Sequence, residues 1–280
     1  NVLCTAMLLP AGGLLEKLAI RIVPDNDAKE QTVELDERLL ASPSLALQRS
    51  RTVASEMAQC AVQALKDSLS EMTQYSPDLA DKIRQAEDQC DHYEDILGTY
   101  LVKLSAKRMG VQESEEATAL LKSIGDFERI SDHAVNVLEA AEELHTKGLS
   151  FSESAQAEFQ VLSDAVSEIL NLSLRCFEQS DVNVAAQVEP LEQVIDTLKE
   201  RIRTRHILRM QQGTCSIEAG FILSDLITNL ERTSDHCSNI AGCVIDAARH
   251  NLNLHETLRE TRLDDPNFQP GLPKGFMEVQ

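Results

Sequence analysis

Residues Glu128 to Asn136 read ERISDHAVN, and residues Glu231 to Asn239 read ERTSDHCSN. Six of the nine positions are identical, at a constant offset of 103 residues. Recurrence of so specific a stretch is the signature of an internal repeat, in which one supersecondary unit occurs twice. The chain is therefore expected to contain two equivalent halves, each carrying one copy of this stretch.

The sequence around each copy has the apolar period of long amphipathic helices. Breaks at Tyr75–Asp78, Gly110 and Gly148 divide the first half, and Gln211–Gly213 corresponds to the Gly110 break in the second. Long helices joined by short turns become antiparallel neighbours, so the fold class is all-α, with two tandem three-helix bundles. The expected helices are 45–74, 78–109 and 113–146, then 152–179, 182–210 and 216–250, with short additional helices at 36–40 and 251–262.

The two ends of the chain differ from this pattern. Val2 to Leu9 is apolar but far shorter than the roughly 20 residues that span a bilayer. It is expected to be either a buried helix or the cut end of a membrane helix, followed by a juxtamembrane helix. The expected organisation is a membrane-segment end or juxtamembrane helix at 1–24, a linker at 25–43, bundles at 44–148 and 151–250, and a short helix with a flexible tail at 251–280.

Composition excludes several classes of function. The chain has 280 residues and a formal net charge of −20, which argues against a nucleic-acid backbone as a partner. Its seven cysteines are odd in number and form no Cys-x-x-Cys pair, so reduced cytosolic thiols are expected instead of a disulfide framework or a zinc knuckle.

Pairs of carboxylates recur at equivalent places in both halves. Residues four apart on a helix share one face, and two antiparallel helices that each offer two carboxylates can surround a hard cation with oxygen ligands. Acidic faces in water, with Arg129 and Arg232 in surface ion pairs, are the alternative interpretation of the same pattern. The candidate metal ligands are Asp91, Asp95, Glu128 and Asp132 in the first half and Glu192, Asp196, Glu231 and Asp235 in the second.

The histidines beside the motif aspartates have a different expected role. His133 and His236 lie about 100° round the helix from Asp132 and Asp235. They are expected to cap a loop, bond a neighbouring backbone or face solvent, and not to bind the same ion. The asparagines that end the two copies, Asn136 and Asn239, are candidates for hydrogen bonds between helices.

The Glu-Arg-x-x-Asp-His-x-x-Asn signature that closes each three-helix repeat resembles the PhoU family, over about Leu45 to His250. That family has a Glu/Asp-x-x-x-Asp metal-cluster motif, which the four carboxylate pairs match. The resemblance implies a cytoplasmic regulatory domain that senses or modulates phosphate uptake, with Fe, Zn, Mn or Mg on its acidic faces. Two departures are Ser131 and Ser234, where the family commonly has Gly, and Pro190, which should kink the fifth helix or mark its true first turn.

The front of the chain carries a second resemblance. The apolar stub, Leu14 to Pro24 and the segment Leu35 to Pro43 resemble the junction between the last membrane segment and the PhoU-like tail of bacterial sodium/phosphate cotransporters. This resemblance implies a multi-pass membrane protein, with the present chain at the cytoplasmic face of the inner membrane. Its partners would be its own transporter domain or phosphate-transport and signalling proteins, with a homodimer as a further assembly.

Two other classes of function stay open as alternatives. One is a stand-alone PhoU-type phosphate-signalling adaptor without metal, and the other is a hydrolase that uses a carboxylate-bound metal pair. A ferritin-like di-iron site needs Glu-x-x-His on two helices, and only Glu142-x-x-His145 fits this pattern. No phosphate-binding Gly-rich loop or nucleophile motif is present, so the chain is expected not to be an enzyme, with no catalytic residue and no organic cofactor.

Overall fold

The computed structural model describes residues 35–249, and within this range every regular element is helical. The all-α expectation is therefore confirmed, and helix boundaries fall within a few residues of the expected ones. The N-terminal segment 1–24 and the short helix expected at 251–262 lie outside the described residues. The elements are η2 (Glu37–Ala41), α3 (Pro43–Glu71), α4 (Pro77–Ser105), α5 (Val111–Lys147), α6 (Glu153–Gln179), α7 (Val182–Ala185), α8 (Val188–Gln211) and α9 (Ile217–Arg249).

The helix ends follow from local sequence. Pro43 and Pro77 each occupy the first turn of their helix, where a missing backbone N–H costs nothing. Before α5, the N–H of Gly110 donates to the Glu113 carboxylate at 2.9 Å. These groups satisfy or remove backbone donors that would otherwise have no partner at a helix N-terminus.

Pro190 divides the expected fifth helix. The segment forms a short α7 and then α8, and Pro190 lies in the first turn of α8. Proline is tolerated there because the first-turn N–H groups have no partner within the helix. The alternative that Pro190 marks a true first turn is thus the correct one, and Glu192 follows close behind the start of α8.

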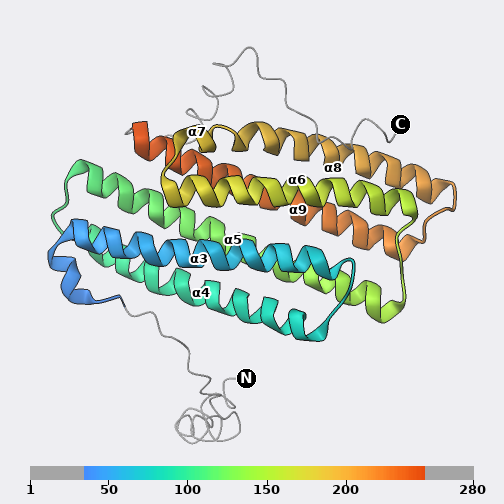
Figure 1. Ribbon diagram of the computed structural model, residues 1–280, viewed down its shortest axis with the longest axis horizontal. Coiled ribbons are helices and arrows are strands. Elements are labelled where there is room, and N and C mark those ends of the chain that lie inside the picture. The colour runs from blue at the N-terminus through green and yellow to red at the C-terminus, as the bar shows by residue number, and fades with distance from the viewer. Residues whose placement is uncertain (1–34, 250–280) are drawn as a thin grey trace, which may run out of the picture. The chain divides into compact units, whose positions relative to one another are not determined.

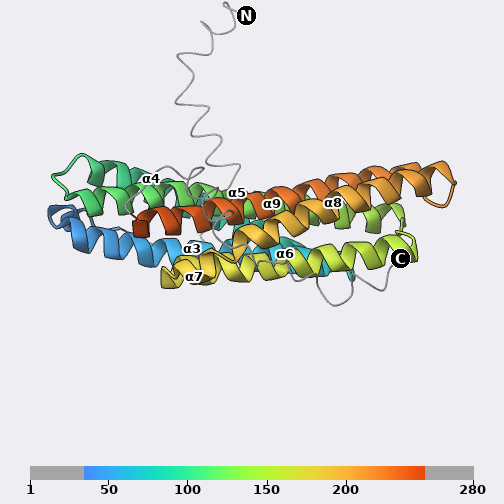
Figure 2. The same ribbon diagram turned by 90° about the horizontal axis from the view of Figure 1, so that it is seen from above.

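The six long helices within residues 35–249 form two bundles that pack side by side (Figures 1 and 2). Helices α3, α4 and α5 pack on one another in the first bundle, and α6, α8 and α9 do so in the second, with α7 against α6 and α9. The bundles meet where α5 lies along α9 and α3 along α6. Because each repeated stretch lies on α5 or α9, the two copies face each other at this contact.

Apolar stripes at helical spacing build the core. Leu97 and Leu101 on α4 and Phe127 on α5 are fully buried, as expected from their period. Phe127 also meets Phe177 of α6 edge-to-face, with ring centroids 5.0 Å apart. This aromatic pair joins the two bundles directly.

None of the described helices has an apolar stretch long enough to cross a membrane.

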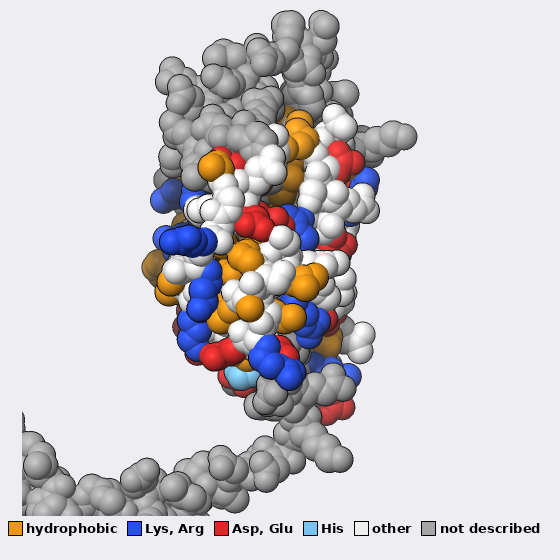
Figure 3. Space-filling model, turned by 90° about the vertical axis from the view of Figure 1, so that its left-hand side faces the viewer, with side chains coloured by type: hydrophobic (Ala, Val, Ile, Leu, Met, Phe, Trp, Pro, Cys, Tyr) orange, Lys and Arg blue, Asp and Glu red, His pale blue; other side chains and the backbone are white. Residues whose placement is uncertain are grey.

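The end of the bundle that carries the α4–α5 turn presents a mixed surface (Figure 3). Hydrophobic, basic and acidic side chains are interspersed there, and Val102 and Val111 beside the turn are exposed. The described part of this end therefore has no single charge character.

Gly148 ends α5 in a conformation that favours glycine. Its φ is +61°, and the backbone N–H groups of Gly148 and Leu149 bond back to the last turn of the helix. A Cβ at this φ is strained, so Gly148→Ala is expected to lower the free energy of unfolding by about 1 kcal/mol. Urea denaturation followed by circular dichroism measures the change.

The matched control is Gly125→Ala in the interior of the same helix. A Cβ at Gly125 meets no atom within 4 Å, so alanine should raise the free energy of unfolding by roughly 0.5–1 kcal/mol. If both substitutions shift stability in the same direction, the left-handed cap at Gly148 is not what ends α5.

Candidate functional site

Three carboxylates from two helices converge on the surface of the first bundle. Glu87 and Asp91 come from α4 and Asp132 from α5, and one ligand atom of each lies within 4.8 Å of the others. Asp91 and Asp132 belong to the set expected from the sequence, whereas Glu87 does not. Asp95 and Glu128, which do belong to it, lie outside this three-residue group. We call Glu87, Asp91, Asp95, Glu128 and Asp132 the first carboxylate cluster.

Small buried residues at the contact between α4 and α5 position this cluster. Cys90 and Ser131 are fully buried, face each other across the contact, and directly precede Asp91 and Asp132. The Ser131 hydroxyl donates to the Glu128 carbonyl at 2.7 Å, so it is satisfied within its own helix. Serine therefore replaces the family's glycine without leaving a polar group unpaired, and the helices still approach closely enough to bring the two aspartates together.

Three carboxylates of the first cluster ionise less readily than isolated ones. Burial raises the pKa of Glu87, Asp91 and Glu128, and negative neighbours raise each pKa further. Arg129 offsets part of this charge, because its guanidinium contacts Asp132 at 2.9 Å and Glu128 at 3.3 Å. Its side chain remains 60% exposed, so the contact is screened by water and leaves the cluster with excess negative charge.

The second bundle places its four expected carboxylates in a different environment. Burial, together with Asp235, Asp196 and Glu231, raises the pKa of Glu192 to about 7. One Glu192 carboxylate oxygen is buried without a hydrogen-bond partner. Lys199 of α8 pairs with Glu231 at 2.7 Å, and both side chains are only 16% exposed. We call Glu192, Asp196, Glu231 and Asp235 the second carboxylate cluster.

Two substitutions between the repeats explain this difference. At the offset of 101 residues that relates α4 to α8, Glu87 corresponds to Val188 and Gly98 corresponds to Lys199. The second bundle has thus lost one carboxylate and gained an ammonium group. Accordingly, within residues 35–249 the convergence of three possible metal-ligand atoms occurs in the first bundle and not in the second.

The motif histidines meet at the contact between the bundles. The His133 and His236 rings lie 5.6 Å apart, and His133 is almost fully buried. His133 Nδ1 lies 3.0 Å from Asn229 Oδ1 on α9, and His236 Nδ1 lies 2.8 Å from Asp126 Oδ1 on α5. A carboxylate can only accept, so the Nδ1–H of His236 donates to Asp126.

This arrangement is reciprocal, because Asp126 and Asn229 occupy equivalent positions at the offset of 103. Each histidine therefore bonds a side chain of the other repeat, and not the loop, backbone or solvent expected from the sequence. Asn239 adds a bond from its amide to Asp126 at 3.2 Å, which confirms the expected contact between helices. Burial lowers the pKa of His133, so this contact favours neutral imidazole.

Asp126 accepts two of these bonds, so its loss should weaken the contact between the bundles. Asp126→Ala leaves the His236 Nδ1–H and the Asn239 amide without their acceptor, and we expect a loss of about 1–3 kcal/mol in the free energy of unfolding. Asp126→Asn should lose less of this free energy, because the asparagine keeps a side-chain oxygen that can accept a hydrogen bond, as Asn229 has in the other repeat. Asp225→Ala, at an exposed position of α9, is the control and should stay within about 0.5 kcal/mol of the parent. Equal effects of Asp126→Ala and Asp225→Ala in urea denaturation would contradict this role.

Glu142 and His145, the one pair with ferritin-like spacing, are engaged in other contacts. Arg84 of α4 binds the Glu142 carboxylate at 2.6 Å, and the Tyr75 hydroxyl donates to it at 3.0 Å. The His145 ring stacks on Tyr75, with ring centroids 4.8 Å apart. These contacts join the end of α5 to the α3–α4 turn, which gives the pair a structural role.

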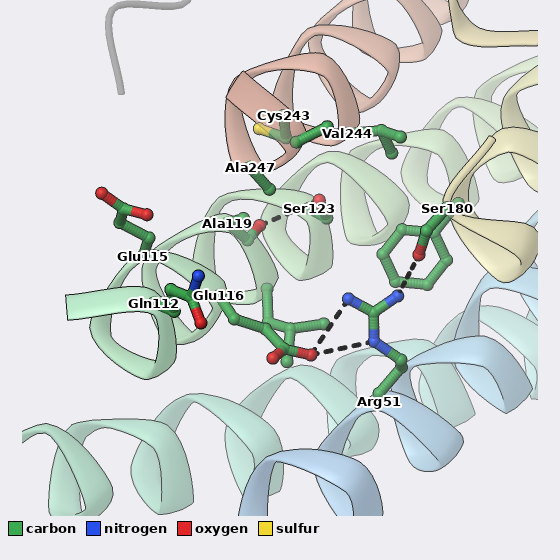
Figure 4. Close-up of a pocket in the computed structure, with 13 residues that line it drawn as sticks. Arg51, Gln112, Glu115, Glu116, Ala119, Ser123, Ser180, Cys243, Val244 and Ala247 are labelled. Atoms are coloured by element: carbon green, nitrogen blue, oxygen red, sulfur yellow. Dashed lines mark hydrogen bonds and ion pairs between the residues drawn. The ribbon is translucent and has the colours of Figure 1, made fainter. Parts of the chain in front are cut away.

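A pocket of about 250 Å³ lies apart from both clusters, between α3, α5 and α9 (Figure 4). Its walls include Ala119, Val244 and Ala247, and Arg51 lies at its edge. The guanidinium of Arg51 binds Glu116 at 3.0 Å and the Ser180 hydroxyl at 2.5 Å. Arg51 thereby joins α3, α5 and the end of α6, and its charge is already neutralised.

The fold and the clusters together define a class of protein. The chain is a duplicated three-helix-bundle protein whose repeats each carry a surface carboxylate cluster beside a buried contact between the repeats. The PhoU domain model matches residues 54–141 and 159–244, one match for each bundle. The chain therefore belongs to the PhoU domain family.

Individual relatives and solved structures agree with this assignment. The chain is 22% identical to "Phosphate-specific transport system accessory protein PhoU homolog 1" of Thermotoga maritima, over 68% of this chain and 82% of the relative. It is 26% identical to the PhoU homolog of Xylella fastidiosa strain 9a5c, over 71% of this chain and 83% of the relative. The crystal structure of the regulatory protein PhoU from Streptococcus pneumoniae superposes with a TM-score of 0.67 at 18% identity, covering 75% of this chain and 98% of that one. The crystal structure of PhoU from Pseudomonas aeruginosa superposes with a TM-score of 0.63 at 23% identity, covering 76% of this chain and 99% of that one.

Proposed function

We propose that this chain is a PhoU-type accessory protein that regulates phosphate transport and does not itself catalyse a reaction. The observation that carries the proposal is the match of the PhoU domain model to both bundles. Relatives that share this repeat are named as accessory proteins of phosphate-specific transport systems. The proposed partners are phosphate-transport or signalling proteins at the cytoplasmic face of the bacterial inner membrane, and no nucleic acid.

A stand-alone adaptor fits these relatives better than a transporter domain does. The aligned part covers 82–83% of two relatives that are named as accessory proteins and not as cotransporters. The narrower proposal, a regulatory domain of a sodium/phosphate cotransporter, rests on the front of the sequence alone. The gene upstream of Asn1 distinguishes them: a continuous reading frame of membrane helices favours the cotransporter, and its absence favours the adaptor.

The first carboxylate cluster is the proposed metal site. Glu87, Asp91 and Asp132 would supply direct oxygen ligands, with Asp95 and Glu128 close by on the same helix faces. Excess negative charge and raised pKa values both favour a cation, because a bound ion removes the repulsion between the carboxylates. An all-oxygen set suits Mg or Mn, and carboxylates also bind Fe and Zn. The second carboxylate cluster is proposed as a weaker site.

Metal analysis tests this part of the proposal. Protein purified without chelator is expected to contain Fe, Zn, Mn or Mg by elemental analysis. After removal of metal, adding the same ion should raise the melting temperature, since an ion that binds only the folded state stabilises it. Absence of metal, combined with an unchanged melting temperature for all four ions, would leave the metal-free adaptor as the better proposal.

Regulation of transport needs a separate measurement in cells. Deleting the coding sequence of residues 44–250 from its own bacterium is expected to change the rate of labelled-phosphate uptake at fixed external phosphate. Restoring the full chain should restore the rate. Uptake that is identical in the deleted and restored strains would contradict the regulatory proposal, whatever the metal content.

The hydrolase alternative predicts a different result. If a metal pair on the carboxylates hydrolysed a phosphate ester, purified protein loaded with metal would turn over para-nitrophenyl phosphate. That turnover would disappear in the variant Glu128→Ala plus Asp132→Ala. We expect no turnover above the buffer rate in either protein.

A further inference from the structure

Two cysteines face each other across the packed helices α3 and α4. The Cys60 sulfur lies 3.5 Å from the Ala86 carbonyl oxygen on α4, and the Cys90 sulfur lies 3.9 Å from the Met57 carbonyl oxygen on α3. Ala86 is one helical turn before Cys90, and Met57 is nearly one turn before Cys60. These reciprocal contacts place both sulfurs at the same level of the helix pair, within hydrogen-bonding reach of each other.

The two thiols differ in their exposure to solvent. Cys60 is partly exposed at the rim of the α3–α4 contact, whereas Cys90 is fully buried beneath it. The hydrogen bond with Cys90 lowers the pKa of the Cys60 thiol. A thiolate is the nucleophilic form of cysteine, so Cys60, and not Cys90, should attack a small oxidant that arrives from solvent. The buried neighbour is then in place to react with the product.

We propose that Cys60 and Cys90 form a hydroperoxide-reactive thiol pair, which closes into a reversible disulfide between α3 and α4. The Cys60 thiolate attacks one oxygen of hydrogen peroxide. A sulfur–oxygen bond forms, the peroxide bond breaks, and the departing hydroxide takes a proton to become water. The sulfur of Cys90 then attacks the Cys60 sulfenic acid, the sulfur–oxygen bond breaks, and the departing hydroxide takes the thiol proton of Cys90. Two thiols are oxidised to one disulfide, and one peroxide is reduced to two waters.

The other described cysteines serve as controls within the same molecule. Burial raises the pKa of Cys176 to about 12 and of Cys243 to about 11, and it raises the pKa of Cys237 as well. These thiols are buried and stay protonated near neutral pH, so they should react slowly. The contact with Cys60 and burial raise the pKa of the Cys90 thiol as well, so Cys90 should not react with peroxide directly, and it differs from the controls only in lying beside the sulfur that does. Cys215 is partly exposed on the α8–α9 turn and gives the rate of an ordinary accessible thiol in this protein.

Peptide mapping of the full chain tests the proposal. Reduced protein is treated with one equivalent of hydrogen peroxide, free thiols are blocked with iodoacetamide, and tryptic peptides are analysed by mass spectrometry. We expect peptide 52–66, which contains Cys60, to be joined to peptide 85–103, which contains Cys90, with the loss of two hydrogen atoms. Dithiothreitol should separate the peptides again. Cys60 should be consumed at least about 10-fold faster than Cys215, because the neighbouring Cys90 favours the Cys60 thiolate and is already in place to form the disulfide.

Two variants examine the order of the steps. Cys90→Ser should leave Cys60 as a sulfenic acid that dimedone traps, whereas Cys60→Ser should protect Cys90 from peroxide. Circular dichroism checks that each variant folds, and if either does not, the peptide map of the unaltered chain decides alone. The proposal is overturned if the unaltered chain gives no linked peptide, if Cys60 pairs instead with another cysteine, or if Cys60 reacts no faster than Cys215.

Discussion

Replacing Asp91 and Asp132 together with asparagine is expected to lower the metal affinity of the first carboxylate cluster by about 100-fold or more. Loss of a group that merely supports a metal ligand already costs roughly 10- to 100-fold, and these two side chains would contact the ion directly. The double substitution also removes two of the three carboxylates that converge there. Isothermal titration with the ion found in the purified protein measures the change.

The equivalent substitutions in the second bundle provide a matched control. Glu192→Gln plus Asp235→Asn removes the two corresponding carboxylates, at the offsets of 101 and 103 residues, and should leave the affinity of the first cluster within about threefold of the parent. Only the first bundle brings three ligand atoms together among the described residues. If the two double variants lose metal equally, the difference between the clusters does not govern binding.

Stability separates a loss of metal binding from a loss of fold. The folded-state pKa of Asp91 is raised by burial and by Asp132, so the folded protein holds its proton more tightly than the unfolded chain does. This carboxylate therefore favours folding at acidic pH, and that contribution is lost as pH rises through the raised pKa. At pH 8 in chelator, the variant Asp91→Asn plus Asp132→Asn should melt at or above the temperature of the parent, because the repulsion is gone. A clearly lower melting temperature would show that these aspartates are needed for the fold.

Local sequence determines most of the fold. Apolar periodicity, Pro43, Pro77, Gly110 and Gly148 place the long helices and their ends, because each acts on the backbone within one or two turns. The duplicated motif then requires the second half to repeat the packing of the first. Even the break at Pro190 follows from its missing N–H, although the separate short α7 before it does not.

The candidate site is less accessible to sequence reasoning, because it depends on which helix faces meet. Glu87 stands four residues before Asp91, the same spacing that selected Asp91 and Asp95, yet the rotation of α4 against α5 decides which members of this series approach Asp132. The contacts of His133 with Asn229, and of His236 with Asp126, arise only when the repeats pack on each other. A single helix contains no signal for a partner about 100 residues away. Alignment of the two repeats does predict that the clusters differ, because Gly98 aligns with Lys199.

That exchange gives the sharpest test of why the clusters differ. A lysine at position 98 would bring an ammonium group to the first carboxylate cluster, as Lys199 does to Glu231 in the second. A Cβ at Gly98 meets no atom within 4 Å, so position 98 accepts a β-carbon without a clash. Repulsion between an ammonium and a divalent ion about 5 Å away, reduced by solvent exposure, predicts a loss of about 10-fold in metal affinity for Gly98→Lys. Gly98→Ala, which adds only the methyl group, should leave the affinity unchanged.

The opposite substitution should make the second bundle depend on metal. Lys199→Ala leaves Glu231, which is mostly buried, without its cation, and is expected to cost about 1–3 kcal/mol of unfolding free energy in chelator. Adding Mn or Mg should recover part of this loss, because an ion can take the place of the ammonium among the four carboxylates of the second cluster. The measurement is the melting temperature of Lys199→Ala with and without metal. All proteins compared also carry Asp91→Asn plus Asp132→Asn, so that metal does not bind at the first cluster. If metal raises the melting temperature of Lys199→Ala no more than it raises that of the protein that keeps Lys199, the ammonium does not occupy the place of a metal ion. In that case the second cluster is an acidic surface stabilised by one ion pair.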